Sequence, residues 1–318
     1  MLTNIKKTSI FLAIALLLTG VSGAVAKPSK QKTKKIQPRV MQSKNDSTIL
    51  TFDIEYQPSN DVIAPPQQGV IKVYLYPDNN LKEIRRNFKQ LVDARVYDSL
   101  LFHRVIPNFM IQGGDPKSKN AASGELLGDG GAQGQGIGPM PFVPGQLYAN
   151  PPRYHKYGAV AIARTGDDHN LERMGSSSQF YIVTSDQRYK PQQIGAMAAD
   201  RRYKYMNVLA QFAGSQENAM RLFSSLYANQ AGNIPDEVAD AYRTVGGTPF
   251  LDEDYTVIGE VIEGMDVAKA IENLPRDNAD RPLGFARIVK VTYSGPEVST
   301  TEAAEALKNI KKEKITTP

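Results

Sequence analysis

The chain has 318 residues, of which 41% are hydrophobic and 22% are charged, and its formal net charge is +5. This composition is that of an ordinary globular protein, and the length allows one large domain or two. The mild positive charge gives no general case for nucleic-acid binding. The chain contains no cysteine, which excludes a disulfide framework and a thiolate metal site.

Residues 1–26 have the pattern of a secretory signal peptide. Lys6 and Lys7 precede an apolar run from Ile10 to Leu18, and the small residues Ala24-Val25-Ala26 follow at the distance expected of a cleavage site. The run is shorter than the roughly 18 residues that a membrane-spanning helix needs. We therefore expect cleavage before Lys27, in preference to an uncleaved anchor, and export across the inner membrane into the periplasm if the source is Gram-negative.

Residues 27–47 carry seven Lys or Arg side chains against one acid, with hardly any large apolar residue. This composition predicts a basic disordered arm. The arm is either a solvated spacer or a segment loosely attracted to an acidic surface, and any contact with a membrane is expected through it alone. A folded domain is expected over 48–295, followed by a charged C-terminal tail over 296–318.

Within the folded domain, hydrophobic periodicity predicts several elements in chain order. Apolar residues alternate with polar ones over 50–56 and 69–76, which is typical of half-buried strands, and they recur at helical spacing over 81–92. Further strands are expected over 158–163, 176–184, 255–261 and 288–293, and a helix over 266–274. The glycine-rich stretch 124–138 lacks the Lys-Ser/Thr of a phosphate-binding loop and is interpreted as a mobile surface loop.

The strongest chemical signal lies between Asp98 and Asp115, where an apolar run contains one Arg or Lys, Arg104. An unpaired buried guanidinium is costly, so Arg104 is expected to line a cleft. Two short strands broken at Pro107-Asn108 would bring Arg104, Phe109, Met110 and Gln112 to one wall. An apolar surface with one cation and one amide is how a small-ligand site is usually built.

The residues from Phe102 to Asp115 resemble the signature of the cyclophilins, the cyclosporin-type peptidyl-prolyl isomerases. Two further blocks match the family in the same order: Gly158 to Arg164 with Ser178 to Ile182, and Gly247 to Asp252 with Tyr255 to Val267. The resemblance implies a mainly β fold, a closed eight-stranded antiparallel barrel with two capping helices, over 48–185 and 246–295. It implies cis/trans isomerisation of X–Pro bonds in unfolded or partly folded polypeptides, without a cofactor.

Carried over position by position, the resemblance implies that Arg104 is the catalytic arginine and that Gln112 orients it and bonds the substrate. Phe109, Met110, Tyr181 and Leu251 match the pocket that holds the proline ring. Ala163, Arg164 and Gln179 match positions that bind the substrate backbone and the residue before the proline. Phe250 and Tyr255 match positions in the wall beside them. Arg164 stands where many members have Asn and is expected to act through its main chain.

Three departures from the family pattern affect this pocket. Tyr181 replaces the usual Phe and adds a hydroxyl, expected at the pocket rim. Phe250 stands where many members have Trp, so cyclosporin binding is expected to be weaker. Tyr255 replaces the usual His, which keeps the apolar wall but changes any hydrogen bond there.

Residues 186–245 are expected to form about three helices inserted between two barrel strands. Single-domain cyclophilins have only a short connection here. The insertion is either a stabilising appendage on the barrel rim or a clamp that contacts client chains beside the active site. A metal site is not expected in the polar loop 165–175, because no two histidines of the chain have ligand spacing.

Two other classes of function stay open. In the first, the chain is a non-enzymatic module that binds proline peptides while the insertion acts as a holdase. In the second, it is an envelope-associated structural protein that uses the basic arm and has the barrel as a scaffold. Aggregation suppression by an Arg104→Ala variant separates the first from an enzyme. Deletion of residues 27–47 followed by cell fractionation tests the second.

Overall fold

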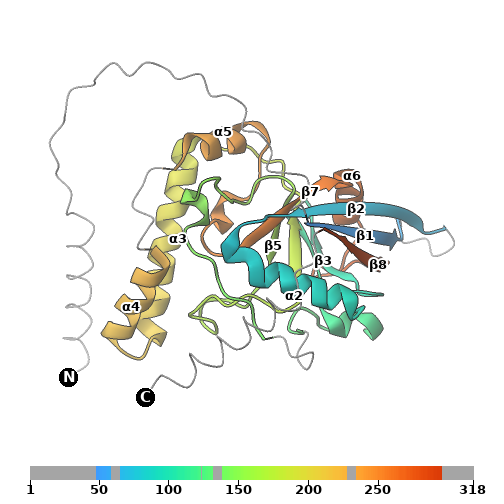
Figure 1. Ribbon diagram of the computed structural model, residues 1–318, viewed down its shortest axis with the longest axis horizontal. Coiled ribbons are helices and arrows are strands. Elements are labelled where there is room, and N and C mark those ends of the chain that lie inside the picture. Colours follow the sequence, from blue (N-terminus) through green and yellow to red (C-terminus); the bar gives the residue numbers. More distant parts are fainter. Residues whose placement is uncertain (1–47, 59–64, 123, 132–137, 228–233, 296–318) are drawn as a thin grey trace. The chain divides into compact units, whose positions relative to one another are not determined.

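The computed structural model describes residues 48–58, 65–122, 124–131, 138–227 and 234–295, and these residues form one barrel with an attached helical segment (Figure 1). Eight antiparallel strands follow the order β3-β4-β6-β5-β7-β2-β1-β8. Their bounds are β1 Thr48–Tyr56, β2 Gln67–Leu75, β3 Phe102–Ile106, β4 Met110–Gly113, β5 Ala159–Ile162, β6 Phe180–Val183, β7 Val257–Glu263 and β8 Ala286–Ser294.

The two end strands, β3 and β8, approach each other closely enough to nearly close the barrel. Leu101, just before β3, forms an isolated antiparallel bridge with Arg287 in β8. The Ser99 amide donates to the Ile288 carbonyl, and the Ile288 amide donates to the Leu100 carbonyl, both at 2.8 Å. The predicted eight-stranded antiparallel barrel is therefore confirmed.

The barrel interior is filled by alternate residues of the strands, as the period of a strand requires. In β1 the buried positions include Leu50, Phe52 and Ile54, which are the positions expected from the sequence. The ring of Phe180 lies 5.4 Å from that of Phe52, and it also contacts Phe88, Tyr97 and Phe102. This aromatic cluster joins strands β1, β3 and β6 to helix α2.

Two helices pack against the barrel, in agreement with the prediction of two capping helices. Helix α2 (Lys82–Asp93) buries Ile84, Phe88 and Leu91 at the spacing of one helix face. Helix α6 (Met265–Glu272) buries Ala268 and Ile271 and contacts β2 and β4. Four short 3₁₀ turns complete the barrel: η1 Asn79–Leu81, η2 Pro116–Asn120, η3 Gln146–Tyr148 and η4 Pro249–Leu251.

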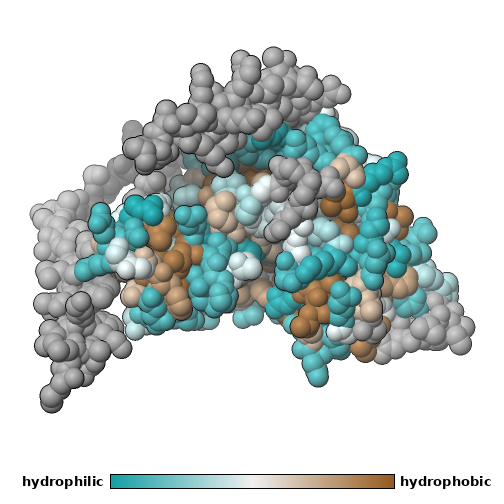
Figure 2. Space-filling model, turned by 90° about the horizontal axis from the view of Figure 1, so that it is seen from below, coloured by the Kyte–Doolittle hydropathy of each residue, from teal (hydrophilic) through white to brown (hydrophobic). Residues whose placement is uncertain are grey.

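The predicted helical insertion is also observed, as α3 (Pro191–Phe212), α4 (Gln216–Tyr227) and α5 (Asp236–Thr244). Helices α3 and α4 pack through a small core that includes Tyr205, Leu209 and Leu222, while α5 packs on Leu147 and Tyr189. Figure 2 shows a largely hydrophilic surface on the face seen from below, interrupted by apolar patches, one of which lies on the left over the α3–α4 hairpin.

The polar loop 165–175 differs from its expectation in one respect, because Arg173 is fully buried there. Its guanidinium forms ion pairs with Asp167 and Asp254, donates to the Tyr227 hydroxyl of α4, and lies 3.7 Å from the centre of the Tyr205 ring. A buried cation requires such partners. This loop therefore connects the barrel to the insertion.

The predicted signal peptide, basic arm and C-terminal tail lie outside the described residues. Among the helices of the part that the structure covers, none has the length and hydrophobicity to cross a bilayer.

Candidate active site

The pairing of β3, β4 and β6 places Arg104, Gln112 and Tyr181 in one row. Arg104 pairs with Gln112, and Gln112 pairs with Tyr181. Directly paired residues of neighbouring strands point to the same face of a sheet. Val105 and Ile111, the next pair along, are fully buried in the barrel core, so the row of Arg104 faces outward.

A β-bulge at His103 gives Arg104 this orientation. Phe102 pairs with Gly113 and Arg104 with Gln112, so two residues of β3 span one step of β4. Without the extra residue, Arg104 and Phe102 would share a face, and Phe102 is buried in the core. A bulge re-aims the side chains that follow it. The guanidinium is therefore directed out of the core, and 44% of the side chain is exposed.

The row borders a cavity of about 90 Å³ that is lined entirely by residues singled out in the sequence. They are Arg104, Phe109, Met110, Gln112, Ala163, Arg164, Tyr181, Leu251 and Tyr255. The two other predicted residues lie beside it. The Phe250 ring is 5.6 Å from that of Phe109, and Gln179 hydrogen-bonds to Gln112. The cavity thus combines apolar and aromatic walls with one partly exposed cation.

The Tyr181 hydroxyl is not at the rim of this pocket, contrary to the expectation from the sequence. It is buried and lies 2.9 Å from His155 Nε2, and His155 Nδ1 lies 2.9 Å from Asp252 Oδ1. Asp252 Oδ2 accepts a 2.7 Å hydrogen bond from the Tyr242 hydroxyl of helix α5. The hydroxyl can be buried, away from the pocket rim, because this network supplies a partner for it. Burial raises the pKa of Tyr181 well above its ordinary value.

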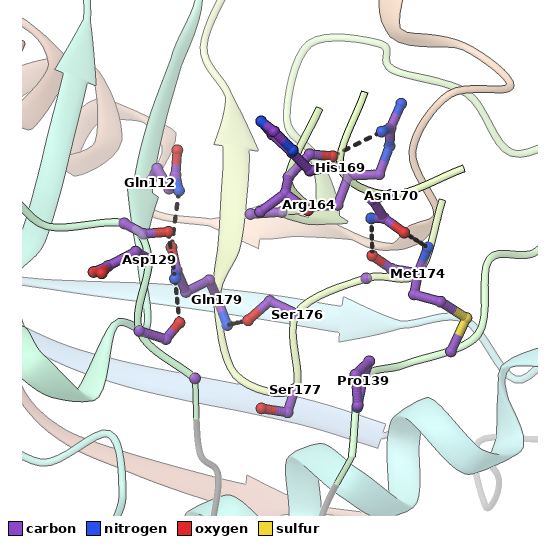
Figure 3. A pocket seen from close by; sticks show the side chains of 16 residues that line it. Gln112, Asp129, Pro139, Arg164, His169, Asn170, Met174, Ser176, Ser177 and Gln179 are labelled. Atoms are coloured by element: carbon purple, nitrogen blue, oxygen red, sulfur yellow. Dashed lines mark hydrogen bonds between the residues drawn. The ribbon is translucent and has the colours of Figure 1, made fainter. Parts of the chain in front are cut away.

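The side chain of Gln112 is held by Gln179 (Figure 3). Gln112 Nε2 donates to Gln179 Oε1 at 3.0 Å, while Gln179 Nε2 donates to the carbonyls of Gly128 and Gly130. The Gln179 amide is thus bonded within the protein on both its oxygen and its nitrogen. Its geometry suits it to orienting Gln112, whereas the sequence suggested that it binds substrate.

The glycine-rich loop is fixed near the site by Asp115. The fully buried carboxylate accepts from the amides of Gly128 and Gly130. A Cβ on Gly130 would lie 1.9 Å from Asp115 Oδ1, so a larger residue there would displace the Asp115 carboxylate. Part of the glycine-rich stretch 124–138, interpreted from the sequence as a surface loop, thus supports Gln179, a role that the sequence did not indicate. Residues 132–137 lie outside the described part.

A second cavity of about 340 Å³ adjoins the first, because Gln112, Ala163 and Arg164 line both. Its other walls come from the 128–131 segment and from residues 174–177 and Gln179 (Figure 3). The two cavities thus lie side by side, next to the Gln112 side chain of β4 and the Ala163–Arg164 segment that follows β5.

Ala163 and Arg164 are both engaged in contacts within the barrel. The Ala163 amide donates to the Gln179 carbonyl, and its own carbonyl accepts from the Ser176 amide. The Arg164 guanidinium pairs with Asp167 at 2.7 Å, donates to the Asp254 carbonyl, and stacks 4.6 Å above the Tyr255 ring. Its side chain is therefore used structurally, and a role of the Arg164 main chain in substrate binding stays a prediction.

Four residues around the site were given no role in the sequence, although two of them end the quoted blocks. Asp115 closes the first block, and Asp252 closes the first part of the third, Gly247 to Asp252. His155 and Tyr242 belong to none of the blocks and are identified only by their contacts. Among the described residues, no group of three or more His, Cys, Asp or Glu side chains is placed to hold a metal ion.

Comparisons with known proteins point to one family. The model of the family described as cyclophilin type peptidyl-prolyl cis-trans isomerase/CLD matches residues 62–293. A protein of Staphylococcus aureus (strain USA300), named for peptidyl-prolyl cis-trans isomerase activity, is 30% identical over 222 residues, which are 70% of this chain and 85% of that protein. A similarly named protein of Staphylococcus saprophyticus subsp. saprophyticus is 28% identical over the same shares of the two chains.

Solved structures of a cyclophilin type isomerase from Cryptosporidium parvum are also similar to this chain. One matches with a TM-score of 0.45 and 17% sequence identity, and the match covers 80% of this chain and 99% of the other chain. Another, determined in the presence of the dipeptide Ala-Pro, matches with a TM-score of 0.44 and 17% identity, over 77% and 99%.

The Tyr181 network gives a prediction for stability. Tyr181→Phe removes the hydroxyl and leaves the ring nitrogen of buried His155 without that partner. We expect the free energy of unfolding in urea to fall by about 1–3 kcal/mol. The matched control is Tyr203→Phe, at a side chain that is 62% exposed, which should change the free energy by less than about 0.5 kcal/mol. Equal values for wild type and Tyr181→Phe would contradict the network.

The bulge residue His103 gives a prediction for pH dependence. Burial lowers its pKa from 6.5 to about 4. Between these values the unfolded chain binds a proton that the folded chain does not, so stability is full above pH 6.5 and falls as the pH drops toward 4. The loss attributable to His103 is about 3 kcal/mol.

The measurement is the free energy of unfolding from neutral pH to pH 4, for wild type and His103→Leu. The variant should lose about 3 kcal/mol less than wild type over this range. A His169→Leu variant, which removes an exposed histidine, should keep the wild-type slope. Parallel curves for wild type and His103→Leu would show that the folded protein accommodates the charged imidazole.

Proposed function

The chain belongs to the cyclophilin-type peptidyl-prolyl cis-trans isomerases, and we propose that Arg104 catalyses the isomerisation by electrostatic stabilisation over the apolar cavity. The observation that carries the proposal is the 90 Å³ cavity, in which one partly exposed guanidinium lies beside apolar walls. The substrates are X–Pro bonds of unfolded or partly folded polypeptides.

The chemistry of the peptide bond explains why an arginine suits this reaction. Rotation about a peptide bond meets a barrier of about 18–20 kcal/mol, because the amide nitrogen shares its lone pair with the carbonyl. In the twisted transition state this resonance is lost and the nitrogen becomes basic. A hydrogen-bond donor aimed at that nitrogen binds the transition state more strongly than either ground state, as catalysis requires. Arginine stays charged and keeps its donors in a rigid plane.

The neighbouring side chains suit this role. Asp280 is the acid beside Arg104, and its Oδ2 lies 3.7 Å from Nε, too far for a direct hydrogen bond. The pairing of Gln112 with Gln179 fixes the amide so that its oxygen is directed away from Gln179, where it can accept from Arg104 or from a substrate amide. Phe109 and Leu251 offer an apolar surface to the proline ring. The mechanism needs no nucleophile, metal or cofactor.

The test is the cis-to-trans rate of a short Ala-Pro peptide with wild type and with Arg104→Ala. Removing one preorganised donor should lower kcat/KM by about 10²–10³-fold. Arg104→Lys should recover only part of the loss, because an ammonium is a point charge and lacks the planar donors.

Arg243→Ala serves as the matched control, since Arg243 is an exposed arginine of α5 paired with Asp240 on its own helix. It should keep the wild-type rate. A folded Arg104→Ala variant with full activity would contradict the role of Arg104. If the folded wild type gave no acceleration at all, peptide binding without catalysis would become the better account.

We further propose that the chain works on exported proteins. The basic residues Lys6 and Lys7, the apolar run after them and the small residues at 24–26 support export and cleavage. N-terminal sequencing of the protein recovered from the producing cells should begin at Lys27, in the fraction outside the inner membrane. A chain that retains Met1, or that stays in the cytoplasmic fraction, would contradict this proposal.

A further inference from the structure

Helix α3 of the insertion forms one wall of a third cavity, of about 450 Å³. The helix contributes Met197, Arg201, Lys204 and Val208, whose spacing of three and four residues puts them on one helix face. The opposite wall comes from the barrel side and includes Phe250. We call this cavity the α3 cleft.

The α3 cleft adjoins the proline cavity. Arg164 and Tyr255 line both of them. Phe250 stands at the junction, because it lines the α3 cleft while its ring lies 5.6 Å from that of Phe109 in the proline cavity. Phe250 is 41% exposed, which is unusual for a large aromatic residue and leaves apolar surface available at this junction.

The cleft is preformed, because α3 is tied to the segment that carries Phe250 and Tyr255. Arg201 of α3 donates to the Pro249 carbonyl at 3.2 Å, and its Nε lies 3.5 Å from Asp254 Oδ1. Asp254 is also paired with the buried Arg173 at 2.7 Å. A ligand therefore meets a wall that is already ordered, which lowers the entropic cost of binding.

Most of the charges around the cleft are paired with one another, and the exposed carboxylate of Asp168 lies 3.3 Å from His169 Nε2. Asp167 pairs with Arg164 and Arg173, Asp254 pairs with Arg173 and Arg201, and Asp200 pairs with Lys204 one turn along α3. Paired charges offer little to a charged ligand. The surface left for contact is the apolar part, from Met197, Val208, Phe250 and Tyr255. The cleft therefore suits an apolar side chain rather than a charged partner.

We propose that the α3 cleft binds the same client polypeptide a few residues away from the X–Pro bond that occupies the proline cavity, and that it selects an apolar side chain there. This inference rests on the proposed function, because the proline cavity fixes one point of the client chain. An extended polypeptide can occupy both cavities at once, since they share a wall, whereas a short Ala-Pro peptide fills only the first. The insertion thus makes long unfolded chains better substrates than short peptides.

The first experiment compares a short Ala-Pro peptide with a long unfolded protein whose refolding is limited by proline isomerisation. Val208→Glu places a carboxylate on the apolar wall, and Val208 belongs to none of the hydrophobic clusters of the core. The ratio of kcat/KM for the long substrate to that for the short one should fall about tenfold, the loss expected when one apolar contact is replaced by a charge.

Tyr203→Glu is the matched control, because it puts the same charge on the same helix at an exposed position that does not line the cleft. It should leave the ratio unchanged. An unchanged ratio in Val208→Glu would overturn the proposal, and so would an equal fall in both variants. The rate with the short peptide reports on the proposed function separately, so the two ideas fail in different ways.

A second experiment uses the absence of cysteine from the chain. Val208→Cys introduces one thiol into the cleft, and Tyr203→Cys introduces one thiol outside it. A proline peptide carrying an activated disulfide several residues from its proline should trap Val208→Cys about tenfold faster than Tyr203→Cys, as binding beside the thiol raises its effective concentration. Replacing the proline by alanine should remove the advantage. Equal trapping rates, or an advantage that survives without proline, would overturn the proposal.

Discussion

The outward direction of Arg104 depends on one irregularity of the barrel, the bulge at His103. In a regular strand, Arg104 would share a face with Phe102, whose ring packs on Phe180 inside the barrel. The extra residue shifts the alternation by one, and a shift of one residue exchanges the two faces of a strand. Arg104 then pairs with Gln112 across β4, and the pocket on the outer face acquires its cation. The bulge residue itself is buried, and burial lowers the pKa of His103 to about 4, so the neutral imidazole is the form that fits there.

Two sets of buried polar contacts connect the insertion to this pocket. In one, Tyr242 of α5 reaches Tyr181 through Asp252 and His155. In the other, Arg173 joins Tyr227 of α4 to Asp254, the residue before Tyr255 in the pocket wall. Buried ion pairs are weak evidence for net stabilisation, because desolvation offsets much of their attraction.

These contacts do fix relative positions, since each buried group needs its partner. The insertion is therefore built into the pocket wall from two directions. This arrangement is more than a helical appendage resting on the rim would need, and it gives α3 a defined position beside the proline cavity.

Much of this architecture could be predicted from the sequence, because it follows from local patterns. The alternation in β1, the amphipathic face of α2 and the three helices of the insertion all appear where periodicity placed them. The cluster of pocket residues followed from motifs whose spacing is matched in one family. The barrel order and its near closure came from that resemblance rather than from periodicity.

What the sequence could not predict depends on contacts between distant residues. His155 and Asp252 are 97 positions apart, and nothing in their neighbourhoods indicates that they meet behind Tyr181. The burial of Arg173 within a polar loop follows from helix α4, which supplies Tyr227 from 54 positions away. The bulge at His103 could not be predicted either. Alternation within β3 indicates a regular strand, and the bulge is visible only in the pairing of β3 with β4.

The central claim is that an X–Pro bond is isomerised at the outward-facing row of Arg104, Gln112 and Tyr181. The most direct measurement is an NMR titration of the labelled protein with an Ala-Pro peptide, recorded together with cis–trans exchange of the peptide at equilibrium. The account predicts that the side-chain Nε–H resonance of Arg104 and the methyl resonances of Met110 and Leu251 shift together. Exchange should accelerate while the cis-to-trans ratio of the free peptide stays unchanged. Faster exchange without any change at Arg104, or with shifts confined to another face of the barrel, would contradict it.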